Sequence, residues 1–219
     1  PKTWKDVWMN EGFSTYSEAL YWEKVSGRSS LISTLQSKFR DYPDNSLYNP
    51  GPNMFGSMVY NKGAWVLHML RKEIGDQNFF NLLRNYFDTY KYKNASTDDF
   101  KVLAENISKK DLSTFFNQWV YFGKGIILLE YDFETKKENN RYFTELKLSQ
   151  LHEEYSAFHF PLDVDVKSSS GKVKSFDFYI SDYDTTLTLH TDFSPYEIIL
   201  DPDNWLMAII SSANEEMNN

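Results

Sequence analysis

Two hydrophobic patterns divide the chain near residue 125. Before that point apolar residues recur at intervals of three and four, as in residues 79–87, which is typical of amphipathic helices. Pro and Gly residues separate the periodic stretches, and Ser96 with Asp99 has the spacing of a helix-capping box. The predicted helices cover residues 9–25, 30–42, 57–74, 76–90, 100–107 and 111–122.

After Gly123–Lys124–Gly125 the apolar residues alternate with polar ones, which is typical of half-buried strands. The alternation predicts about seven short strands, at residues 129–133, 143–148, 160–166, 173–180, 186–191, 196–200 and 206–210. Short strands with turns between them indicate an antiparallel β-sandwich of the immunoglobulin-like type. We therefore predict an α+β fold, with a helical domain over residues 1–123, the sandwich over 124–211 and a frayed tail over 212–219.

Composition and charge narrow the classes of function. Hydrophobic residues make up 41% of the 219 residues, enough for packed cores. The absence of Cys excludes disulfides and thiolate metal sites but does not fix the compartment. Residues 1–125 hold 16 Lys and Arg against 13 Asp and Glu, and residues 126–219 hold 7 against 18, so neither part predicts nucleic-acid binding. No apolar run reaches the length of a membrane span.

The first predicted helix carries a polar stripe that starts at Glu11. Residues three, four and seven positions apart share a helical face, so Glu11 shares its face with Ser14, Thr15 and Glu18. A solvated face is the simplest interpretation of this stripe. Aromatic residues crowd the same turns, however, and a buried carboxylate needs a partner, for which a metal ion is one option.

Two blocks of sequence resemble the aminopeptidase N-like zinc metallopeptidases, the gluzincins. The first is WKDVWMNEGFSTYSEAL, beginning at Trp4, and the second is MVYNKGAWVLHMLR, beginning at Met58. The second half of the chain is similar to the sandwich that follows the catalytic domain in that family. The resemblance therefore implies the helical C-terminal part of a thermolysin-like catalytic domain, followed by an antiparallel β-sandwich.

The resemblance also implies roles for four residues. Glu11 would be the carboxylate ligand of a zinc ion that two histidines also bind, an open site at which a water attacks the peptide carbonyl. Glu18 would orient one of those histidines. Tyr60 would donate a hydrogen bond to the tetrahedral oxyanion. Phe55 would form an aromatic wall of the pocket for the first side chain of the substrate.

Each of these residues also has a simpler interpretation. Tyr60 alone, one of 15 tyrosines, is more often a core or surface residue. The sequence Lys62–Gly63–Ala64 could serve only to let two helices approach closely. His68 is more typical of a packing histidine than of a ligand. The two blocks together favour the functional interpretation.

The His-Glu-x-x-His motif that provides the other ligands and the general base in this family is absent from the chain. His152 starts a similar pattern, but Ser156 stands where the second His belongs, and the stretch lies among predicted strands. The family spacing places the missing histidines before Pro1. We therefore expect a C-terminal fragment of a zinc aminopeptidase that is inactive by itself and does not retain the zinc.

The expected partners of the longer enzyme are a peptide substrate and the N-terminal remainder of the same polypeptide, without nucleic acid. Three alternatives stay open. The chain could be a pseudoenzyme or a non-catalytic protein-interaction module that uses its acidic sandwich. A family member with additional epoxide-hydrolase activity is a third, which no residue here favours.

Overall fold

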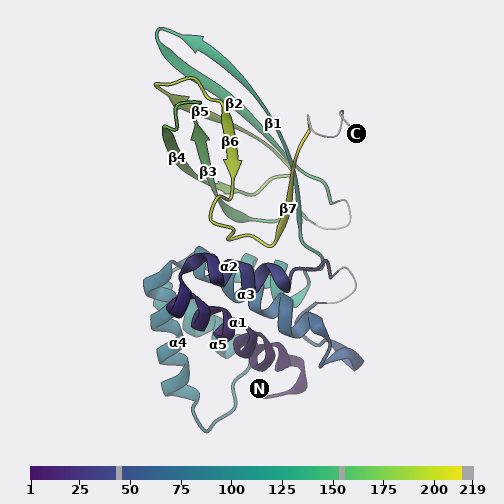
Figure 1. Ribbon diagram of the computed structural model, residues 1–219. Coiled ribbons are helices and arrows are strands. Elements are labelled where there is room, and N and C mark those ends of the chain that lie inside the picture. Colours follow the sequence, from purple (N-terminus) through teal and green to yellow (C-terminus); the bar gives the residue numbers. More distant parts are fainter. Residues whose placement is uncertain (43–45, 153–155, 214–219) are drawn as a thin grey trace. The chain divides into compact units, whose positions relative to one another are not determined.

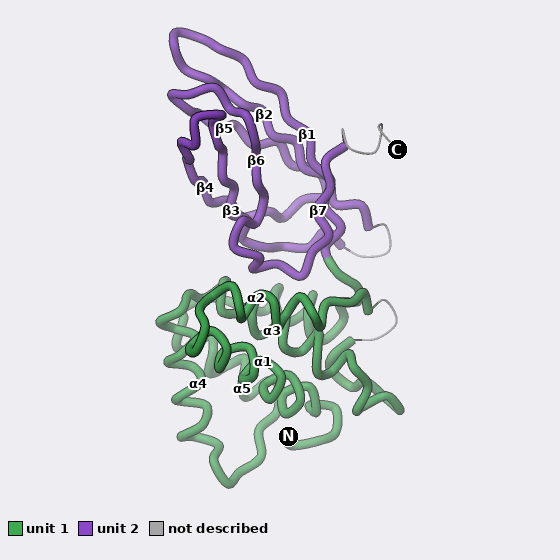
Figure 2. Tube along the Cα trace, in the orientation of Figure 1, with its two compact units in different colours: residues 1–126 green, residues 127–219 purple. Residues whose placement is uncertain are grey.

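A computed structural model describes residues 1–42, 46–152 and 156–213 of the chain (Figure 1). The chain divides into two compact units, residues 1–126 and residues 127–219 (Figure 2). The first unit is helical and the second contains the strands, which confirms the α+β class. No helix in the described ranges is both long enough and apolar enough to cross a bilayer.

The first unit packs its helices around buried aromatic side chains, among them Trp8, Trp65 and Trp119. Its elements are η1 (Trp4–Asp6), α1 (Val7–Ser26), α2 (Arg28–Ser37), η2 (Gly51–Asn53), α3 (Ser57–Ile74), α4 (Asp76–Tyr90), α5 (Thr97–Ser108), α6 (Ser113–Phe116) and η3 (Asn117–Tyr121). The bounds of α3 and α4 coincide with the prediction. The predicted capping box is also present, since the side chains of Ser96 and Asp99 each accept from the other residue's backbone N–H.

Two predicted helices differ from those observed. α2 ends at Ser37, five residues before the predicted end at Tyr42. The predicted helix over 111–122 divides into the single turn of α6 and the π-helix η3. Such wider turns are uncommon and often occur at functional positions.

The second unit contains two sheets. Their strands are β1 (Ile127–Glu138), β2 (Arg141–Gln150), β3 (Phe160–Lys167), β4 (Val173–Ile180), β5 (Asp184–Thr191), β6 (Glu197–Leu200) and β7 (Ala208–Ser212). The strand order is β5-β2-β1-β7 in one sheet and β4-β3-β6 in the other. The predicted alternation is clearest in β3, where every second residue from Phe160 to Val166 is buried.

All strand pairs in the two sheets are antiparallel except β1 and β7, which pair in parallel. A parallel neighbour requires a long connection rather than a hairpin. β1 and β7 meet this condition because they are the first and the last strand of the unit along the chain. Of the tail predicted over 212–219, residues 214–219 lie outside the described part of the chain.

Candidate active site

Helices α1 and α3 carry the two blocks of sequence singled out above, and they meet at two glycines. A Cβ atom built on Gly12 would lie 2.9 Å from both the Cα and the carbonyl carbon of Gly63. Contacts on either side occur in the same order along the two segments, from Trp4 of η1 with Phe55, just before α3, to Tyr16 of α1 with His68 of α3. The helices therefore run in the same direction, with their backbones in contact.

This approach brings Glu11 and Tyr60 together, since Glu11 precedes Gly12 and Tyr60 lies one turn before Gly63. The Tyr60 hydroxyl lies close to the Glu11 carboxylate, and both side chains are half-buried. Desolvation raises the pKa of Tyr60, and its interaction with the negatively charged Glu11 carboxylate raises it further. The phenol therefore keeps its proton at neutral pH and remains a hydrogen-bond donor.

The other two candidate residues lie on the surface of the first unit. Glu18 is exposed, with its carboxylate 3.0 Å from the ammonium of Lys38. An exposed ion pair of this kind contributes little stability, so the carboxylate can exchange partners at low cost. Phe55 is 58% exposed and packs edge to face against Trp4, with ring centroids 5.8 Å apart.

The aromatic residues around α1 divide into two groups. Trp8 and Tyr16 are buried, as the crowding of aromatics predicted. Trp4 is 62% exposed, because it belongs to η1 and precedes the helix that packs into the core. The polar face with Ser14 and Glu18 is exposed to solvent in this structure.

The role of Asp6 was not found from the sequence. Its buried carboxylate accepts hydrogen bonds from the backbone N–H and the hydroxyl of Thr97, both at 2.9 Å. The Trp8 indole donates to the same hydroxyl at 3.0 Å. Thr97 is the first residue of α5, so Asp6 satisfies an N-terminal amide of that helix. The contact spans 91 positions, and spacing along the chain contains no signal for it.

His68 belongs to a buried polar network farther along α1 and α3. The Tyr16 hydroxyl is hydrogen-bonded with His68 Nδ1 at 3.0 Å. Arg71 pairs with Glu23 at 2.6 Å and with both carboxylate oxygens of Asp76 at 2.8 Å. Burial raises the pKa of Tyr16. The network holds the two helices together beyond the glycine contact.

Across the described ranges, no three His, Asp or Glu residues come together in a way that could hold a metal ion. Glu11 thus offers a single carboxylate. The His152–Ser156 stretch includes residues 153–155, which lie outside the described part of the chain, while His152 itself packs against the rings of Phe158 and Tyr183.

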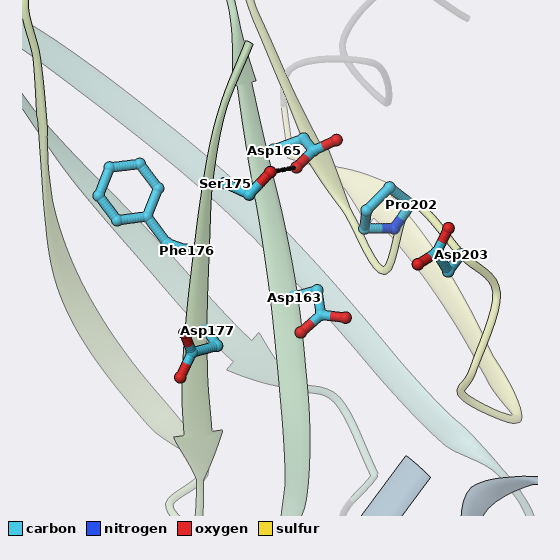
Figure 3. Close-up of a pocket in the computed structure, with 7 residues that line it drawn as sticks. All are labelled: Asp163, Asp165, Ser175, Phe176, Asp177, Pro202 and Asp203. Carbon is cyan, nitrogen blue, oxygen red and sulfur yellow. Dashed lines mark hydrogen bonds between the residues drawn. The ribbon is translucent and has the colours of Figure 1, made fainter. Parts of the chain in front are cut away.

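The second unit has an acidic pocket of about 310 Å³ on the strands β3 and β4 (Figure 3). Four aspartates line it, Asp163, Asp165, Asp177 and Asp203. Ser175 donates a hydrogen bond to Asp165 across the two strands. The pocket accounts for part of the acidic character of this unit.

Comparisons with known proteins point to one family. Aminopeptidase A of Gloydius brevicauda is 26% identical over 195 residues, which are 80% of this chain and 20% of that protein. Aminopeptidase N of Streptomyces lividans is 30% identical over 148 residues, which are 60% of this chain and 17% of that protein. The chain therefore spans about a fifth of the length of these relatives.

A solved structure shares the fold. The chain superposes on aminopeptidase A of Legionella pneumophila, determined in complex with aspartic acid, with a TM-score of 0.78 and 18% identity, covering 94% of this chain and 24% of that one. A model of the peptidase family M1 domain matches residues 1–119, a range that includes both helices of the Glu11–Tyr60 pair. The resemblance of the two sequence blocks is thereby confirmed, and the chain belongs to peptidase family M1.

Proposed function

We propose that this chain contributes Glu11 and Tyr60 to the active site of a zinc aminopeptidase that removes N-terminal residues from peptides. The contact between the Tyr60 hydroxyl and the Glu11 carboxylate supports this most directly. It places a neutral hydrogen-bond donor next to a metal-ligand type of side chain, on two helices fixed by backbone contact. The family match and the aminopeptidase relatives agree with it.

Zinc fits these residues in part. A half-buried carboxylate on a rigid helix is a suitable ligand, but a zinc site of this class needs three protein ligands. We infer that two histidines from the rest of a longer polypeptide complete the site. A bound zinc ion would supply Lewis-acid polarisation at the scissile peptide bond. The 219-residue chain alone should neither retain zinc nor turn over substrate.

The residues of this chain would act on the substrate by position. Tyr60 donates its proton in a hydrogen bond to the oxygen that becomes negative in the tetrahedral intermediate, and its raised pKa keeps that proton in place. Phe55 presents an exposed ring as a wall for the first side chain of the peptide. Glu18 orients the imidazole of a ligating histidine, in exchange for its surface pair with Lys38.

The test is a Glu11→Ala change in the longer polypeptide, with Glu18→Ala as the comparison on the same helix. We expect Glu11→Ala to lose zinc, measured by elemental analysis after dialysis, and to lose hydrolysis of an aminoacyl p-nitroanilide. Glu18→Ala should weaken zinc binding by about 10–100-fold, as removal of an outer partner of a metal ligand does. Full zinc occupancy in the Glu11→Ala protein would contradict the ligand assignment.

A further inference from the structure

Lys62 is a completely buried lysine on α3, two residues after Tyr60. A buried ammonium is costly unless hydrogen bonds replace its hydration. Its Nζ donates to the backbone carbonyl of Gly125 at 3.1 Å and to that of Gly123 at 3.3 Å. The carbonyls of Gly123 and Gly125, near the end of the first unit, therefore replace part of the hydration that the buried ammonium has lost.

The backbone fixes the position of these two carbonyls. The π-helix η3 ends at Tyr121, two residues before Gly123, whose N–H donates to the carbonyl of Asn117. A Cβ atom on Gly123 would lie 1.3 Å from the carbonyl oxygen of Gln118, so only glycine fits there. Gly125 has a φ of +69° and donates its N–H to the carbonyl of Tyr42. The acceptors of Lys62 are thus a rigid element rather than a loose loop.

Lys62 and Tyr60 lie on opposite sides of the same helical turns. Two residues of an α-helix rotate by about 200°, so one side chain faces the Gly123–Gly125 segment while the other faces Glu11. The N-cap of α3 is Gly56, which provides no side-chain hydrogen bond to the first turn. The first turns of α3 are therefore positioned by lateral contacts, those of Lys62 and of Gly63, and not by a capping side chain.

We propose that Lys62 is a positioning residue whose ammonium, bound to the carbonyls of Gly123 and Gly125, fixes the rotation of the first turns of α3 and so aims the Tyr60 hydroxyl at Glu11. This inference rests on the proposed function, in which Tyr60 donates to the oxyanion. Burial lowers the pKa of Lys62 to about 8, while the charge of Asp41 opposes that shift, so the ammonium still predominates at neutral pH.

The test measures the contact between Tyr60 and Glu11 directly, in the 219-residue chain. Nuclear Overhauser cross-peaks between the Tyr60 ring protons and the Glu11 side chain are recorded at pH 7, with Tyr60→Phe to assign the ring. We compare Lys62→Met, which has similar length but no donor, with Lys62→Gln, which keeps one. Lys72→Met, on the same helix but far from Tyr60, is the matched control.

We expect the cross-peak to be strong in the parent chain and in Lys72→Met, several-fold weaker in Lys62→Met, and partly restored in Lys62→Gln. An unchanged cross-peak in a folded Lys62→Met protein with a lower melting temperature would overturn the proposal, because Lys62 would then only stabilise the fold. If Lys62→Met does not fold, Lys62→Gln carries the comparison. A cross-peak there as strong as in the parent chain likewise overturns the proposal, because the shorter glutamine side chain cannot reach both carbonyls.

The failure of the proposed function gives a different result. A parent chain without the cross-peak would refute the Glu11–Tyr60 pair itself, and the positioning role with it. Loss of zinc binding by Glu11→Ala does not depend on Lys62, so that measurement tests the ligand assignment separately. In the longer enzyme, we expect Lys62→Met to lower kcat with little change in KM, since the oxyanion donor acts in the transition state.

Discussion

Replacing Gly12 by alanine tests whether backbone contact between α1 and α3 builds the site. Two effects of this change oppose each other. Alanine is a better helix former than glycine by about 1 kcal/mol, which favours the variant. The added methyl group would lie 2.9 Å from the Cα and carbonyl carbon of Gly63, which disfavours it. The sign of the measured change shows which effect is larger.

We expect the clash to be larger. Overpacking a tightly packed contact costs about 1–3 kcal/mol, and the upper part of that range applies here because a backbone cannot rotate away as a side chain can. After subtraction of the helix propensity, Gly12→Ala should lower the free energy of unfolding by about 1–2 kcal/mol. The helices must also separate, so the contact between Tyr60 and Glu11 should weaken.

Urea unfolding followed by tryptophan fluorescence measures this effect, with the midpoint compared at constant slope. Ser14→Ala is the matched control, since Ser14 is an exposed position on the same helix, two residues away. That change removes no contact with α3 and should alter the stability by no more than about 0.5 kcal/mol. A Gly12→Ala chain that is more stable than the parent would refute the backbone contact.

Three further predictions concern other parts of the first unit. Tyr60→Phe should lower kcat of the zinc-loaded longer enzyme by about 10²–10³-fold with little change in KM, measured by p-nitroanilide hydrolysis, and an unchanged kcat would exclude the oxyanion role. Burial lowers the pKa of Lys62 from 10.5 to about 8. Between pH 8 and pH 10.5 the unfolded chain binds more protons than the folded one, so the free energy of unfolding rises with pH. The rise begins near pH 8 and reaches up to about 3 kcal/mol at pH 10.5. The urea midpoint of the parent chain should therefore rise between pH 7.5 and pH 9.5 relative to that of Lys62→Met. Equal changes in the two midpoints would contradict the lowered pKa of Lys62. Asp6→Ala should cost about 2 kcal/mol and speed amide exchange at Thr97, whereas unchanged exchange there would show that Asp6 does not cap α5.

Helical periodicity and capping residues, which are local features of the sequence, were enough to predict α3, α4 and the start of α5. The bounds of α3 and α4 follow from Gly75 and from strong helical periodicity, and the start of α5 follows from the capping box. The π-helix η3 could not be predicted in the same way. Its geometry depends on Gly123, where a side chain would overlap the carbonyl of Gln118, and helical periodicity does not record such contacts. The parallel pairing of β1 and β7 likewise depends on contacts between distant segments.

The candidate site shows the same division more sharply. The resemblance to a known family singled out Glu11 and Tyr60, and their meeting in space stayed a consequence of the fold, since 48 residues lie between them. Gly63 supports the simpler interpretation of Lys62–Gly63–Ala64, because it lets two helices approach closely. Close approach and active-site chemistry are therefore not competing explanations for that stretch. In the proposed function, the close approach is what brings Glu11 and Tyr60 together.

The two halves of the stretch WKDVWMNEGF contact different helices. Its first half, through Asp6 and Trp8, fixes Thr97 at the start of α5. Its second half, through Glu11 and Gly12, meets α3. Because one continuous stretch makes both contacts, the position of the Glu11 carboxylate is determined by packing on two sides. Packing on two sides preorganises the carboxylate, as the proposed role of Glu11 as a metal ligand requires.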